Sequence, residues 1–103
     1  MAARTHEETA TEKRKLIEAI EGNELSLGEA VRRMREITGL SQKAYSERIV
    51  GISTRILAEI ELDRGNPTVE TLNKIGRPFG YTVGFIPRVR KERRDTAIAD
   101  TSR

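Results

Sequence analysis

The stretch "LSQKAYSERIVGISTRILAEIE", residues Leu40–Glu61, decides the fold, because it holds two short helical patterns separated by one glycine. Ser41 can cap the first helix and Ser53 the second, since a serine hydroxyl accepts a hydrogen bond from an unpaired N–H of the first turn. In the second helix, Leu57 and Ile60 have the spacing of a buried face. Such a pair is typical of the helix-turn-helix unit, although many other helical domains also contain short helix pairs.

Further helices are predicted on both sides of this unit. Residues 15–22 form a short helical pattern, and Ser26 with Glu29 has the spacing of a capping box before a helix that ends at Gly39. Thr68 can cap a last helix that ends near residue 80. We therefore expect an all-α bundle of about five helices over residues 15–80, with its core in 26–80. In the first helix of the central pair, the expected inward residues are Ala44, Tyr45 and Ile49.

The segment "YTVGFIP", Tyr81–Pro87, changes the hydrophobic period from 3.6 to 2 and predicts a strand. No second strand is evident in the sequence, so the backbone N–H and C=O groups of this strand would lack partners. The same strand of a second copy supplies them most economically. We therefore expect a homodimer formed by an antiparallel ribbon, with these dimerisation residues: Tyr81, Val83, Phe85 and Ile86.

Composition limits the function. The chain has no cysteine and one histidine, His6, so a metal site or a histidine-based catalytic pair has almost nothing to be built from. We expect no cofactor and no enzyme. Residues 1–14 are expected to be a disordered segment or the frayed start of a helix, and the basic residues 88–103 are expected to be disordered. No apolar run has the length of a membrane span and no leader is evident, which predicts a cytoplasmic protein without a membrane partner. A net charge of +3 is a mild indication of polyanion binding.

The open face of the second central helix carries polar side chains suited to a DNA major groove. Arg55 could bind guanine O6 and N7, Thr54 could reach a base or a phosphate, and Glu59 could accept from cytosine N4. The alternative is a solvated charged helix face. Gln42 follows a capping serine and could bind a phosphate at the helix N-terminus. The full predicted DNA-binding set is Gln42, Lys43, Ser53, Thr54, Arg55, Ala58, Glu59, Arg64 and Asn66.

Several motifs in order resemble the Xre/Cro/cI family of phage-repressor-like helix-turn-helix regulators. They are Leu40-Ser41-Gln42, Gly51-Ile52-Ser53, Gly65-Asn66-Pro67-Thr68 and Thr71-Leu72-Asn73-Lys74-Ile75, within residues 27–80. The resemblance implies binding to double-stranded DNA at a palindromic operator and a structural ion pair between Arg35 and Glu61. Two departures stand out. Between Gln42 and Ile60 the chain has one residue more than the commonest spacing of the family, which suggests a wider turn between the two helices. Asp63 stands where a glycine often ends the second of these helices, which suggests that the chain leaves this helix with a different geometry.

The terminal strand also resembles the dimerising strand of HipB-like antitoxins, which implies a toxin protein as a further partner. The function expected from the sequence is a dimeric repressor or autorepressor that is also a candidate antitoxin. Two alternatives remain open. One is a controller protein of a restriction-modification system, and the other is a protein-interaction module with little DNA specificity of its own.

Overall fold

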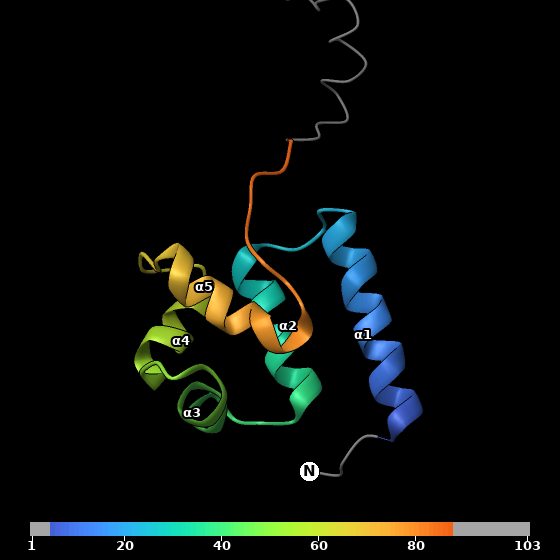
Figure 1. Cartoon of the computed structure of the whole chain (residues 1–103), viewed down its shortest axis with the longest axis horizontal. Helices are drawn as coiled ribbons and strands as arrows, with labels where there is room; N and C mark the ends of the chain where they lie inside the picture. Colours follow the sequence, from blue (N-terminus) through green and yellow to red (C-terminus); the bar gives the residue numbers. More distant parts are fainter. Residues whose placement is uncertain (1–4, 88–103) are drawn as a thin grey trace, which may run out of the picture.

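The computed structural model describes residues 5–87 of the 103-residue chain as a bundle of helices around α2 (Figure 1). The helix α2 contacts α1 on one side and α4 and α5 on the other. A π-helical turn, η1, directly continues α3, and a 3₁₀ turn, η2, follows α5. The all-α architecture with five α-helices agrees with the sequence. The bounds are α1 His6–Glu21, α2 Leu27–Thr38, α3 Gln42–Ala44, η1 Tyr45–Val50, α4 Thr54–Glu61, α5 Val69–Gly76 and η2 Arg77–Phe79.

The predicted side-chain caps start the helices. The Ser26 hydroxyl accepts from the N–H of Glu29 at 3.1 Å while the Glu29 carboxylate accepts from the N–H of Ser26 at 2.8 Å, which completes the capping box before α2. Ser41, Ser53 and Thr68 cap α3, α4 and α5 in the same way, each accepting from the N–H three residues later. Each cap satisfies an N–H that has no partner within its helix, so the helix starts were readable from the sequence.

The prediction of a disordered segment over residues 1–14 is wrong from His6 onward, because α1 begins there. Thr5 and Glu8 form a capping box, with both of its hydrogen bonds at 3.0 Å. The first two turns of α1 hold no large apolar residue, so they extend a helix that is anchored further along by the fully buried Leu16. Residues 1–4 lie outside the described part of the chain.

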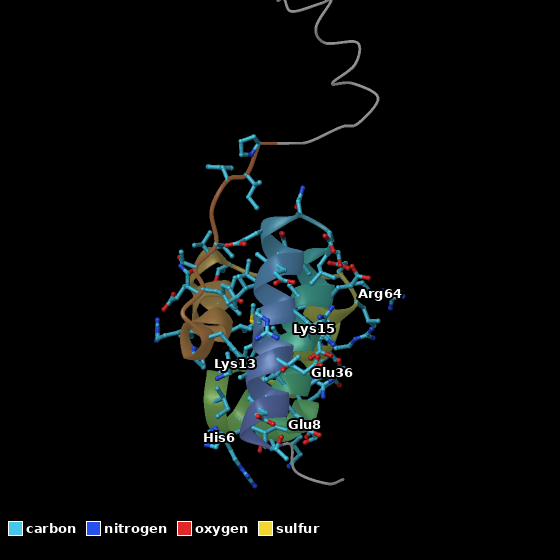
Figure 2. The ribbon with its side chains drawn as sticks, turned by 90° about the vertical axis from the view of Figure 1, so that its right-hand side faces the viewer. His6, Glu8, Lys13, Lys15, Glu36 and Arg64 are labelled. Carbon is cyan, nitrogen blue, oxygen red and sulfur yellow. The ribbon has the colours of Figure 1, made fainter. Side chains whose placement is uncertain are left out.

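The core is a single apolar cluster to which α1 contributes. Its members are buried side chains from five helical segments: Leu16, Val31, Met34, Ile37, Tyr45, Val50, Leu57, Ile60 and Ile75. In Figure 2, α1 crosses the front of the bundle. Because Leu16 is fully buried, α1 is an integral part of the core.

The extra residue of the helix-turn-helix stretch lies within η1, and the turn that follows is not widened. A π-helical turn contains one more residue than an α-helical turn, since its hydrogen bonds span five residues. The N–H of Gly51 accordingly donates to the carbonyl of Ser46, five residues earlier, at 2.7 Å. This shifts the inward position by one residue. Val50 is therefore buried and Ile49, predicted to face inward, is 43% exposed.

Residues 81–87 follow η2 and form neither helix nor strand within the described structure. Tyr81 stacks on Phe79 with ring centroids 6.4 Å apart. The N–H of Val83 donates to the side-chain oxygen of Asn73 at 2.9 Å, so one amide that we expected to need a partner strand is satisfied within the chain. Beyond it Phe85 is fully exposed. The predicted strand and its pairing across a dimer are thus not part of this structure, and the predicted disordered tail, 88–103, lies outside the described residues.

Candidate nucleic-acid interface

The two central helices are joined through a buried polar contact. Gly51 has the left-handed φ of 81° that ends η1, and α4 starts three residues later. Ser46 is fully buried in η1, and its hydroxyl lies 3.0 Å from the hydroxyl of Thr54 in the first turn of α4. Thr54 was expected to face outward as a DNA reader. Instead it is half-buried, because its hydroxyl pairs with that of the buried Ser46.

A buried ion pair fastens α4 to α2. The Arg35 guanidinium donates to both oxygens of the Glu61 carboxylate, at 2.7 and 3.0 Å, and also to the carbonyl of Leu40 at 3.0 Å. The Glu61 side chain is only 3% exposed. The hydrogen bond to Glu61 raises the pKa of the Arg35 guanidinium above its ordinary value, so the pair stays ionised. Paired charges in this bidentate form set the orientation of α4 against α2.

The same carboxylate also holds Gln42. The side-chain amide of Gln42 donates to Glu61 at 2.9 Å, and the residue remains partly exposed at the start of α3. Within residues 5–87, no group donates a hydrogen bond to the side-chain oxygen of Gln42. The glutamine that the sequence suggested as a phosphate ligand is therefore held in a fixed place by the core of the domain.

Arg55 is the most exposed of the predicted base readers. Its side chain is 84% exposed on the first turn of α4, and it forms an ion pair with Glu59, one turn away at 3.6 Å. Lys43, 72% exposed on α3, has an equivalent pair with Glu47 at 3.6 Å. Exposed pairs of this kind contribute little to stability. Both cations are free to exchange their carboxylate for another anion.

The loop after α4 presents the last two predicted contacts. Arg64 and Asn66 are exposed, and they border a shallow pocket of about 180 Å³ together with Glu59. Figure 2 shows Arg64 projecting from the side of the domain. Asp63 adopts the left-handed φ of 59° that a glycine would take at this place. The chain therefore leaves α4 without the different geometry that the sequence suggested.

Ser53 and Ala58 complete the predicted set. Ser53 is exposed and its hydroxyl caps α4, while Ala58 is half-buried. The structure therefore brings exposed Lys43 and Arg55, partly exposed Gln42, and the loop residues Arg64 and Asn66 to the surface around the helix-turn-helix. Thr54 points into the domain.

Two negative findings apply to residues 5–87. None of the helices there is both long and apolar enough to cross a membrane. That part of the chain also brings no three histidine, aspartate or glutamate side chains together as a metal site would require.

Comparison with known proteins gives one family and one weak relative. Residues 28–83, more than half of the chain, match the family model described as "Helix-turn-helix domain". The chain is 38% identical over 53 residues to a protein of Haemophilus influenzae named "Uncharacterized HTH-type transcriptional regulator". That match covers 52% of this chain and 53% of the relative, so the chain spans about half the length of the curated relative it matches. No solved structure matches the chain.

Proposed function

Because the chain belongs to the helix-turn-helix domain family, we propose that it is a DNA-binding transcriptional regulator that inserts α4 into the major groove and acts as a dimeric repressor. The Haemophilus influenzae relative, named as a transcriptional regulator, supports the regulatory role. The finer assignment to the HipB-like branch is part of this proposal.

One observation carries the proposal: Arg55 extends into solvent from the first turn of α4. The opposite face of α4 is used for folding, since Leu57 is fully buried and Ile60 is 3% exposed. The N-terminal residues of a recognition helix reach the base edges, and an arginine there binds guanine O6 and N7 in bidentate fashion. The surface pair with Glu59 is weak enough to be given up for such a contact.

Phosphate contacts come from the residues around α4. Gln42 has a free side-chain oxygen and a second amide hydrogen, and its anchoring by Glu61 lowers the entropy cost of ordering it on a phosphate. Lys43 is a flexible cation beside it. Arg64 and Asn66 flank the other end of the groove-facing surface. These contacts position the protein on the duplex, and Arg55 supplies sequence information.

The proposed dimer forms through the C-terminal segment 81–87. Two copies joined there present two α4 helices to one duplex, which requires a palindromic operator with half-sites about 34 Å apart. The roles of antitoxin and of controller protein both include this DNA-binding step. An antitoxin would in addition carry a stable toxin partner, which co-purification from the native host detects.

The test is binding of the full chain to a duplex from upstream of its own gene and to a scrambled duplex of equal length, at two salt concentrations. We expect affinity for the native duplex to exceed that for the scrambled one by about a thousandfold or more. Higher salt should weaken binding to both duplexes, because phosphate contacts release counterions. Equal weak binding to both duplexes would contradict a sequence-specific regulator and leave the helix-turn-helix as a scaffold for protein interaction.

A further inference from the structure

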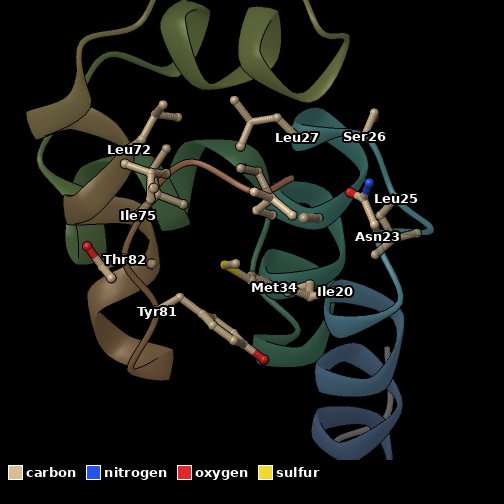
Figure 3. Close-up of a pocket in the computed structure, with 16 residues that line it drawn as sticks. Ile20, Asn23, Leu25, Ser26, Leu27, Met34, Leu72, Ile75, Tyr81 and Thr82 are labelled. Atoms are coloured by element: carbon tan, nitrogen blue, oxygen red, sulfur yellow. The ribbon is translucent and has the colours of Figure 1, made fainter. Parts of the chain in front are cut away.

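An apolar pocket of about 260 Å³ opens beside the C-terminal segment (Figure 3). Its walls come from the end of α1 and the loop after it, from α2, from α5, and from residues 81–84 with Ile86. Figure 3 shows the labelled Met34 and Tyr81 side chains bordering the cavity on the side opposite Leu27. An apolar cavity of about 150 Å³ is already large enough for a benzene ring. This pocket therefore has room for one aromatic side chain.

Next to the pocket the same chain carries an aromatic ring with nothing to pack against. Phe85 is fully exposed, with a relative accessibility of 108%, and Ile86, at the rim of the pocket, is 61% exposed. Together they are the most exposed pair of neighbouring apolar side chains in residues 5–87. An exposed apolar ring beside an unfilled apolar pocket marks an interaction site.

The backbone of the segment has one occupied edge and one free edge. The N–H groups of Tyr81 and Val83 donate to the Gly76 carbonyl and to the Asn73 side chain, which both belong to α5. In an extended chain the N–H and C=O groups of alternate residues point to the same edge. When residues 81–87 run extended, the opposite edge belongs to Thr82, Gly84 and Ile86, whose N–H groups donate no hydrogen bond to any described residue. A free edge of this kind is a template for another strand.

We propose that Phe85 fills the pocket of a second copy of this chain, with Gly84 on the twofold axis of an antiparallel ribbon. This rests on the dimer of the proposed function and gives it a register. If the free-edge residues pair among themselves, then Gly84 lies opposite the partner's Gly84 and Thr82 opposite the partner's Ile86. That register is the one that pairs all three free-edge residues within the segment.

The register also decides where Phe85 points. Residues that lie opposite one another in an antiparallel pair have their side chains on the same face. Phe85 then lies opposite the partner's Val83 and on the same face as the partner's Tyr81, and these two residues line the pocket. A register shifted by one residue would turn Phe85 to the opposite face, away from Tyr81 and Val83. The register that pairs the free edge therefore also brings Phe85 beside two residues of the pocket.

The tail of the same chain is a poorer occupant. Residues 88–103 follow the last described residue, Pro87, but their first seven residues include Arg88, Arg90, Lys91, Arg93 and Arg94. Placing these cations against an apolar wall would remove their hydration without a compensating partner. The second copy instead offers an uncharged ring of suitable size.

Disulfide trapping tests the register, because the chain has no native cysteine. A Cβ at Gly84 meets no atom within 4 Å, so Gly84→Cys should fold normally. Across the axis the two Gly84 Cα atoms would be about 5.5 Å apart, within the range of a disulfide. We expect mild oxidation to convert Gly84→Cys to a covalent dimer. The matched control Thr82→Cys should remain uncrosslinked, because its two copies would lie roughly 13 Å apart along the ribbon. Crosslinking of Thr82→Cys in place of Gly84→Cys, or of neither variant, would overturn the register.

Phe85→Ser tests the ring. Because Phe85 is fully exposed, the variant should keep the far-ultraviolet circular dichroism of the native chain while its dimer dissociation constant rises by about tenfold or more. Val69→Ser, which replaces an apolar side chain that is 64% exposed and lies outside the pocket, should leave dimerisation unchanged. An unaltered dimer in Phe85→Ser, or a native chain that is monomeric by light scattering at micromolar concentration, would overturn the proposal.

Neither readout requires DNA, so the two proposals fail separately. A native chain that dimerises as described but binds native and scrambled duplexes equally would refute the regulator and leave the pocket assignment intact. A Phe85→Ser chain that dimerises normally and binds its operator would refute the pocket assignment and leave the regulator intact.

Discussion

The carboxylate of Asp63, directly after α4, accepts a hydrogen bond of 2.7 Å from the backbone N–H of Gly28 in the first turn of α2. Its second oxygen accepts from the Ser26 hydroxyl, also at 2.7 Å. One side chain thus ties the end of the proposed recognition helix to the start of the central helix. A negative charge at a helix N-terminus also interacts favourably with the helix dipole.

These hydrogen bonds make the stability pH-dependent. The Ser26 hydroxyl and the Gly28 N–H lower the pKa of Asp63 below its ordinary value of 3.8. Since the folded pKa is below the unfolded one, the stabilisation is present above pH 3.8 and is lost as the pH falls through the lowered value. Asp63→Asn, which tolerates the same positive φ, should therefore be less stable than the native chain at neutral pH. In urea unfolding, the difference should shrink in acid, and a difference independent of pH would contradict this role.

Gly28 lets α2 approach α4 closely. A Cβ at this position would lie 2.5 Å from the carbonyl oxygen of Ile60 and 2.8 Å from that of Glu61, and both are backbone atoms. We expect Gly28→Ala to destabilise the fold by about 1–3 kcal/mol in chemical denaturation, as overpacking does, despite the better helix propensity of alanine. Gly84→Ala, where a Cβ meets nothing within 4 Å, is the control and should leave monomer stability unchanged.

The Arg35–Glu61 pair should show strong coupling. Removing one partner leaves a largely buried charge without its counterion, so Glu61→Met should cost about 3–5 kcal/mol of unfolding free energy. Arg35→Met combined with Glu61→Met removes both charges and should be more stable than either single variant. A thermodynamic double-mutant cycle measures this coupling, and additive losses would show that the pair contributes no more than separate surface charges.

Arg55 should determine base preference without affecting the fold. Because its side chain is 84% exposed, Arg55→Ala should leave the melting temperature nearly unchanged. On the native operator it should cost about 1–3 kcal/mol of binding free energy and relax the preference at one base pair. Gln42→Ala should weaken binding to all duplexes alike. An equal loss on operator and random DNA for Arg55→Ala would show that it contacts only phosphate.

Tyr45 should contribute to alkaline sensitivity. Burial, with a smaller contribution from the charge of Glu61, raises the pKa of Tyr45 to about 12. The unfolded chain loses this proton first, so stability falls as the pH rises from about 10 towards 12. Tyr45→Phe removes this titration. It also removes the hydrogen bond to the Ile75 carbonyl, and this loss should lower the free energy of unfolding by about 0.5–1.5 kcal/mol. Unfolding at neutral and alkaline pH checks both effects.

Local signals were enough to predict much of this fold. Helix starts depend on a cap and the residue three positions on, so those at Ser26, Ser41, Ser53 and Thr68 were readable. The capping box at Thr5 has the same form, but it precedes two turns without large apolar residues, and the helix there was missed.

What could not be predicted depends on contacts distant in sequence or on backbone register. Thr54 turns inward because Ser46, on a different helix, is buried beside it. Asp63 reaches Gly28, 35 residues earlier, and no local pattern signals that partner. The burial of Val50 in place of Ile49 depends on a π-helical turn, which hydrophobic spacing at the α-helical period cannot reveal.

The η1 turn has a consequence for transferring residue roles between homologues. In an alignment with a relative that is one residue shorter here, the gap belongs within residues 45–50. A gap placed in the following loop would equate Ile49, 43% exposed, with the relative's core residue and leave Val50, 6% exposed, in the loop. Because the insertion is absorbed before Gly51, the residues of α4 keep their correspondence to those of the shorter relative, and only the assignments inside η1 shift.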